Sequence, residues 1–255
     1  MSDGPPDPID GPVSAIRWFF GTDHQFVVFI REILSSISIV VVIGLFLFAV
    51  SGVWPPMVAV ESSSMQPHFK PGDLVFIVDN QRYLRAGGVN NTGIVPYQQA
   101  QQVEYKAFGS FGDVIVFAPP NRHGPPIIHR ARLWVNKGEN WFTKANPKYI
   151  PQATNCQELR YCPAPYAGFI TKGDWNPYYD QTNGISPIVK PSWIIGTAEF
   201  RIPELGWIRL MISQQFSITP SVAPSPQLAN WSSVRRPMIS YRIELEQKVV
   251  HHQGH

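Results

Sequence analysis

The chain has 255 residues, a formal net charge of +3 and only 15% charged residues. Its sequence contains no run of lysine or arginine, so the composition excludes an extended nucleic-acid-binding surface. Proline (25 residues) and glycine (19 residues) are frequent, and no long stretch beyond residue 55 has a helical hydrophobic period. We therefore expect the part after residue 55 to be mostly β, with short strands joined by turns.

The first 32 residues combine an acidic, proline-rich start with an aromatic stretch, AIRWFFGTDHQFVVFIREI. Aromatic side chains of this kind are typical of the membrane interface. We predict that residues 1–32 form a cytoplasmic or interfacial segment without chemistry of its own.

Residues 33–54 read ILSSISIVVVIGLFLFAVSGVW and carry no charge. As a helix, about 20 such residues match the hydrocarbon core of a membrane. A cleavable signal peptide is the alternative, because Ala49-Val50-Ser51 offers small residues, but the run exceeds the roughly 7–15 residues of a signal peptide's apolar region. Arg17 and Arg31 precede the run and only Lys70 follows it closely, which favours a cytoplasmic N-terminus and an extracytoplasmic domain.

The remaining chain reads as one β-rich domain over residues 55–213, with insertions near 79–110 and 146–167 and a C-terminal extension over 214–255. The segment KPGD at 70–73 has proline and glycine where a type II turn requires them. Apolar or alternating runs predict strands at 74–78, 114–117, 127–135, 141–145, 168–172 and 193–202.

Cys156 and Cys162 lie in one loop, NCQELRYC. In a domain outside the cytoplasm, two cysteines so spaced predict a disulfide, and two free thiols are the alternative. No second cysteine or histidine pair has ligand spacing, so we expect no zinc site, and we interpret the terminal HHQGH as a solvated tail.

Three consecutive serines follow the apolar run closely. If residues 58–64 are extended, Ser62 and Ser64 point to one face and Ser63 to the other. Hydroxyl groups before a turn commonly bond to the backbone, so the serines alone do not indicate catalysis.

A histidine and two aspartates extend this pattern. His129 shares the apolar face of its predicted strand, where it is either a core residue or a neutral general base. Asp174 and Asp180 lie in TKGDWNPYYDQ, where each carboxylate alone is typical of a turn. In combination with a serine and a histidine, either aspartate can accept the imidazole N–H and hold the tautomer that deprotonates serine.

These segments resemble the type I signal peptidases, in their archaeal and endoplasmic-reticulum-like branch. The family signature Ser-Gly-Ser-Met-x-Pro, just after a membrane helix, stands here as SSSMQP at 62–67, and it places the nucleophile at Ser64. The family's histidine in the strand IIHRA corresponds to His129, and the TKGD segment resembles the Gly-Asp-Asn-Asn box. That box points to Asp180 as the triad acid, with Asp174 in support. GDLVFIV, GDVIVF and IIGTAEFRIPELGWIRL fit the same pattern, so the resemblance covers roughly residues 30–212.

The resemblance implies an antiparallel β-sheet catalytic domain of the signal-peptidase type on a single N-terminal transmembrane helix. It implies a serine endopeptidase, without cofactor or metal, that removes signal peptides from secretory preproteins by cutting after small-x-small sites at the outer membrane surface. The Ser62 hydroxyl and the Ser64 N–H would stabilise the oxyanion. The implied partners are secretory preproteins, the lipid bilayer and the protein-translocation channel. Ser63 and Trp175 depart from the family pattern, which has glycine and asparagine there.

Two other readings of the sequence stay open. One is a membrane-anchored β-domain that binds peptides without catalysis, with Ser64 and His129 far apart. The other is a self-cleaving serine protein of related fold, for which Ala49-Val50-Ser51 is the candidate site.

Overall fold

The computed structural model describes residues 11–82, 85–120, 122 and 124–216, without the side chains of residues 212–216. Most of the predicted C-terminal extension, including the HHQGH tail, lies outside the described residues.

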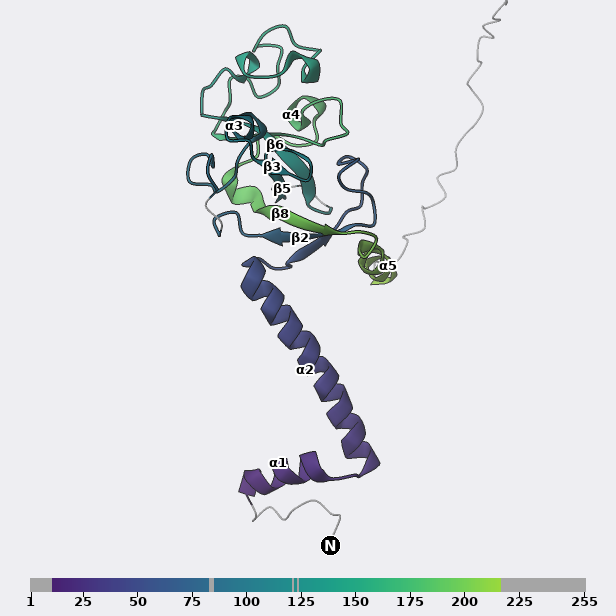
Figure 1. Ribbon diagram of the computed structural model, residues 1–255. Helices are drawn as coiled ribbons and strands as arrows, with labels where there is room; N and C mark the ends of the chain where they lie inside the picture. The colour runs from purple at the N-terminus through teal and green to yellow at the C-terminus, as the bar shows by residue number, and fades with distance from the viewer. Residues whose placement is uncertain (1–10, 83–84, 121, 123, 217–255) are drawn as a thin grey trace, which may run out of the picture. The chain divides into compact units, whose positions relative to one another are not determined.

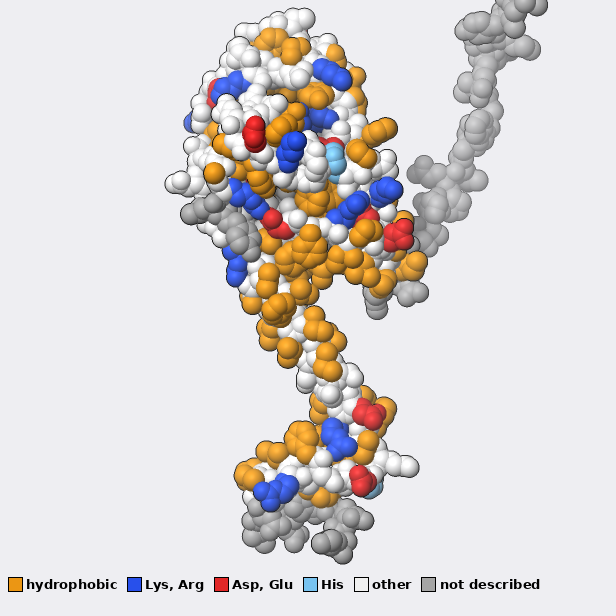
Figure 2. All heavy atoms as spheres, in the orientation of Figure 1, with side chains coloured by type: hydrophobic (Ala, Val, Ile, Leu, Met, Phe, Trp, Pro, Cys, Tyr) orange, Lys and Arg blue, Asp and Glu red, His pale blue; other side chains and the backbone are white. Residues whose placement is uncertain are grey.

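Two helices come first, α1 (Gly11–Gly21) and α2 (Gln25–Ser51). The 27 residues of α2 span about 40 Å, and the helix is long and apolar enough to cross a membrane. Figure 2 shows apolar side chains along much of α2, where they are exposed rather than packed against the chain.

The bounds of α2 correct the prediction of a helix over 33–54. The helix begins at Gln25 and ends at Ser51, because Gly52 adopts a left-handed conformation (φ 77°) and its N–H donates to the Phe48 carbonyl. Ser51 is buried, and its hydroxyl donates a 2.8 Å hydrogen bond to the Ile77 carbonyl. The end of α2 is therefore hydrogen-bonded to the β domain.

A six-stranded antiparallel sheet has the order β1-β2-β8-β5-β6-β7 (Figure 1). Its strands are β1 (Met57–Ala59), β2 (Leu74–Val78), β5 (Val114–Phe117), β6 (Ile127–Val135), β7 (Gly168–Lys172) and β8 (Ile194–Ile202). A small hairpin consists of β3 (Lys106–Ala107) and β4 (Ser110–Phe111). The other elements are α3 (Tyr97–Gln102), η2 (Trp141–Thr143), η3 (Pro147–Tyr149), α4 (Asp180–Asn183), η4 (Pro191–Trp193) and α5 (Gly206–Phe216).

The predictions of β2, β5, β6 and β7 are confirmed, and β8 begins one residue later than predicted. The KPGD turn is also confirmed, because the Asp73 N–H donates to the Lys70 carbonyl and Gly72 has φ 88°.

The strand predicted over 141–145 is wrong. Residues 141–143 form the 3₁₀-helix η2, because the Asn140 side chain accepts a hydrogen bond from the Phe142 N–H and caps the turn. Trp141 is fully buried there, and its indole N–H donates to the Tyr161 carbonyl.

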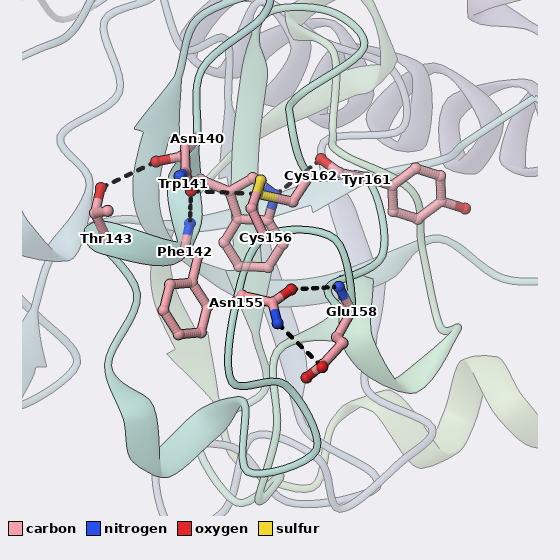
Figure 3. Close-up of a disulfide and its surroundings, with 9 residues drawn as sticks. All are labelled: Asn140, Trp141, Phe142, Thr143, Asn155, Cys156, Glu158, Tyr161 and Cys162. Carbon is pink, nitrogen blue, oxygen red and sulfur yellow. Dashed lines mark hydrogen bonds between the residues drawn. A yellow bond between two sulfur atoms is a disulfide. The ribbon is translucent and has the colours of Figure 1, made fainter.

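Cys156 and Cys162 are joined by a disulfide in the insertion that follows β6 (Figure 3). Trp141 of η2, just before this insertion, packs edge-on against Tyr179, at 6.1 Å between ring centroids. The same buried cluster also contains Leu133, Ile150, Leu159, Ile170 and Ile188. Tyr149 of the insertion also packs against Tyr179, so the insertion contacts the start of α4.

The segment after β1 packs across the sheet instead of continuing along its edge. Met65 and Phe69 are buried against residues of β2, β5 and β8. Ser64 follows the edge strand β1 in the sequence but lies next to His129 of β6, four positions away in the strand order.

Candidate active site

Ser64 lies at the start of a turn whose buried residues anchor it. The predicted extended run ends at Ala59, and residues 62–68 are bends and turns. Hydrogen bonds from the N–H groups of His68 and Phe69 to the Met65 carbonyl close this turn. The Ser62 and Ser64 Oγ atoms still lie 3.0 Å apart. The two hydroxyls therefore share one side, although not through strand alternation.

His129 lies on β6, the strand between β5 and the edge strand β7, opposite Ile115 of β5. Its side chain belongs to the buried face, as the alternation predicts, and only 4% of the residue is exposed. The Nε2 atom lies 2.9 Å from Ser64 Oγ, and the Nδ1 atom lies 2.6 Å from Asp180 Oδ2. The histidine thus bridges the serine and one aspartate.

Asp180 is the first residue of α4 and is fully buried. Its Oδ2 atom also accepts a 2.7 Å hydrogen bond from the Thr171 hydroxyl of β7. Because an ionised carboxylate only accepts, we assign the His129 proton to Nδ1, which leaves Nε2 free to accept from Ser64. This is the tautomer that a general base requires.

Asp174 has different partners. Its carboxylate accepts two hydrogen bonds from the Arg130 guanidinium, at 2.8 and 2.7 Å, and lies 2.8 Å from His68 Nδ1. Burial alone would raise the pKa of Asp174, but the bonds and charge of Arg130 hold that pKa below its ordinary value. Of the two predicted acids, the structure brings Asp180, and not Asp174, to His129.

The loop after β7 contacts the turn that carries Ser64. The Trp175 N–H donates a 2.9 Å hydrogen bond to the Ser64 carbonyl. A Cβ atom at Gly173 would lie 2.6 Å from the Ser64 carbonyl oxygen and 2.9 Å from His129 Nε2. Only glycine therefore allows the loop to approach both residues so closely.

Arg130 follows His129 on β6 and is fully buried. Besides Asp174, its guanidinium donates to the carbonyls of Ala107 and Gly112, at 3.0 and 2.6 Å. Thr171 and His68 also contact the predicted aspartates, and no sequence pattern marked either residue. The available signal was Arg130 and Arg132 within a predicted strand that is otherwise largely apolar, because a buried guanidinium requires a carboxylate.

A cleft of about 520 Å³ opens beside Ser64 and His129. Its lining includes Ala59 and Val60, and Ile127 and Ile128 at the start of β6. A hydroxyl that can be deprotonated therefore faces a partly apolar cleft, which is an arrangement suited to acyl transfer from an extended peptide.

No family model matches the chain, and no curated protein matches its sequence. The resemblance to the type I signal peptidases therefore rests on short motifs.

Proposed function

We propose that this chain is a membrane-anchored serine endopeptidase that removes signal peptides from secreted preproteins. The proposal is carried by the continuous hydrogen-bonded chain from Ser64 through His129 to Asp180. Each of these groups has the residue type, the distance and the burial that nucleophilic catalysis at a carbonyl requires.

In the proposed reaction, Ser64 Oγ attacks the scissile carbonyl while His129 Nε2 accepts the hydroxyl proton. His129 then gives this proton to the leaving amine, and Ser64 remains as an ester of the signal peptide. A water molecule attacks that ester, with His129 again accepting the proton and returning it to Ser64. Asp180 keeps the ring in place and stabilises its charged form.

The negative oxygen of the tetrahedral intermediate needs donors. The Ser62 hydroxyl, 3.0 Å from Ser64 Oγ, is one candidate, and the Ser64 backbone N–H is the other. In other serine hydrolases, removal of one such donor costs about 3 kcal/mol of transition-state stabilisation. Ser62→Ala is therefore expected to lower kcat by about 100-fold.

The sheet topology supports an extended substrate. Strand β1 is at one edge of the sheet. Arg209 of α5 donates to the Met57 carbonyl, and Ala59 lines the cleft, so a peptide can pair as an added strand beside Ala59. Alternate side chains of such a peptide point to the same side, so the first and third residues before the cut face the cleft together. The small-x-small specificity implied by the family resemblance fits this geometry.

The helix α2 supports the choice of substrate. Its end at Ser51 is hydrogen-bonded to β2, and the turn bearing Ser64 follows after one short strand. A signal peptide holds its apolar part in the bilayer and its cleavage site near the surface. We propose a cytoplasmic N-terminus and an extracytoplasmic catalytic domain, with preproteins, the bilayer and the translocation channel as partners.

Self-cleavage at Ala49-Val50-Ser51 is less well supported than cleavage of preproteins, because this candidate site is helical. Ala49-Val50-Ser51 forms the last turn of α2, and the Ser51 hydroxyl is engaged with the Ile77 carbonyl. A peptide bond in that helical turn is not available as an extended strand in the cleft.

The deciding experiment is cleavage of a labelled secretory preprotein by the detergent-solubilised full chain, with the cut mapped by mass. Wild type is expected to cut after a small-x-small site, and Ser64→Ala is expected to be inactive. Ser63→Ala is the matched control, because Ser63 is exposed and its side chain is not part of the Ser64–His129–Asp180 hydrogen-bond network. Equal cutting by wild type and Ser64→Ala would refute the proposal, and no cutting by folded wild type would favour a peptide-binding domain.

A further inference from the structure

Lys172 is a buried lysine at the end of β7, between two residues of the site. Thr171 before it donates to Asp180, and Gly173 after it lies against Ser64 and His129. Only 4% of Lys172 is exposed.

The ammonium group of Lys172 is bonded to the backbone of the loop that follows. It donates to the carbonyls of Gly173 (2.8 Å), Asn176 (2.6 Å) and Asp174 (3.3 Å). A charged lysine has three N–H donors, whereas a neutral amine has two and a lone pair. Three carbonyl acceptors therefore match the charged form, and the Tyr149 ring, 4.7 Å away, adds a favourable cation–π contact.

The same loop contacts the proposed nucleophile. The Trp175 N–H, between two of the bonded carbonyls, donates to the Ser64 carbonyl. The Asp174 N–H lies 3.4 Å from the sulfur of Met65, the residue after Ser64. Carbonyls held by Lys172 thus fix the backbone that meets the Ser64 turn.

We propose that charged Lys172 is a positioning residue, which holds the loop at 173–176 against Ser64 and so keeps Ser64 Oγ in line with His129. This inference rests on the proposed peptidase function for its activity measurements. Lys172 itself contacts neither Ser64 nor a reacting atom in this scheme.

The charge of Lys172 is sensitive to pH near neutrality. Burial, and then the positive charge of Arg132 on β6, lower the pKa of Lys172 to about 8, and Lys148 on η3 acts in the same direction. Asp174 in the loop and Asp180 on α4 act in the opposite direction without cancelling the effect. Above about pH 8 the neutral amine leaves one carbonyl of the loop without its donor.

As pH rises, the Lys172 contribution to the free energy of unfolding should increase while kcat falls. The unfolded chain keeps the ordinary lysine pKa of 10.5, so between about pH 8 and 10.5 it binds more protons at Lys172 than the folded chain. The contribution of Lys172 to the free energy of unfolding therefore rises through this window. A fall in kcat over the same window is a loss of positioning and not of folding.

The test is the dependence of kcat on pH, from about pH 6 to about pH 10, for wild type, Lys172→Arg and Lys172→Met in the full chain. Wild type is expected to lose activity as pH rises through about 8. Lys172→Met is expected to lose about 10-fold or more in kcat at neutral pH, with KM nearly unchanged and without that alkaline fall. Lys172→Arg should stay active and shift the fall to higher pH, because the guanidinium remains charged.

Lys137→Met is the matched control, since Lys137 is exposed in the loop after β6. Wild-type kcat in Lys172→Met, or a wild-type alkaline fall in either Lys172 variant, would overturn the inference. If Lys172→Met does not fold, the Lys172→Arg profile alone decides.

Hydrogen exchange separates this inference from the proposed function. Exchange at the Trp175 amide, corrected for its intrinsic rate, should accelerate at least about 10-fold in Lys172→Met and not in Lys172→Arg. If wild type cuts no preprotein, the proposed function fails on that result. Unchanged exchange in folded Lys172→Met would overturn the positioning role by itself.

Discussion

The Trp175 N–H donates a 2.9 Å hydrogen bond to the carbonyl oxygen of Ser64. The loop after β7 and the turn after β1, which are more than 100 residues apart in the sequence, are joined by this bond. The position of the proposed nucleophile therefore depends on how closely the two backbones approach.

Gly173→Ala tests this approach. The added methyl group would overlap the Ser64 carbonyl and the His129 ring, so the loop must move away. A displacement of about 1 Å at a nucleophile costs about 100-fold in kcat. Gly21→Ala, at the end of α1 with open space around it, should keep wild-type activity. Full activity of Gly173→Ala in the preprotein assay would contradict the importance of this contact.

Asp180→Asn and Asp174→Asn should fail for different reasons. Asp180→Asn replaces the acceptor that orients His129, so we expect kcat to fall by about 10,000-fold with a nearly native fold. Asp174→Asn leaves the buried Arg130 guanidinium without a negative partner, so we expect a loss of at least about 3 kcal/mol in the free energy of unfolding.

Urea unfolding and kcat, measured on both aspartate variants, separate the two effects. If Asp174→Asn were inactive but stable and Asp180→Asn retained activity, the assignment of the triad acid would have to be reversed.

The acid dependence of stability should include a contribution from Asp174. Its pKa is lower in the folded chain than its ordinary value of 3.8, so the stabilisation is complete above that value. It is lost as pH falls below about 4 toward the folded-state pKa, because the unfolded chain then binds more protons. Unfolding free energies measured from about pH 6 to about pH 3 should fall less steeply for Asp174→Asn than for wild type. Parallel curves would contradict this account.

Removal of the disulfide should weaken the packing around Tyr179, the residue before Asp180. Cys156 and Cys162 close a loop with a sequence separation of 6, for which the chain-entropy relation gives about 2 kcal/mol of stabilisation. Tyr149 of this insertion and Trp141 of the preceding η2 pack on Tyr179, the residue before Asp180. The double variant Cys156→Ser, Cys162→Ser is therefore expected to melt at a lower temperature and to have a reduced kcat.

A reductant provides the control for the disulfide variant. It should lower the melting temperature of wild type and leave that of the double variant unchanged. An equal effect of the reductant on both proteins would point to a cause other than this bond.

Elements with a clear hydrophobic pattern were predictable from the sequence. The uncharged run predicted an apolar helix, and the alternation in β6 predicted that His129 lies on the buried face, because both patterns express local geometry. The bounds were less accurate, since the end of α2 is decided by the left-handed turn at Gly52, and η2 forms where a strand was expected because Asn140 caps it.

The joining of distant segments was decided by the tertiary structure. Alternation places Arg130 opposite His129 on β6 but does not reveal that Asp174 reaches that side, which leaves Asp180 for the histidine. Neither does the sequence predict that Lys172 bonds the loop against Ser64. Periodic patterns report which face of one element is buried, whereas hydrogen-bond partners depend on how the elements pack. For buried charged groups, that packing must supply an opposite charge, as for Arg130 and Asp174, or hydrogen-bond partners, as for Lys172.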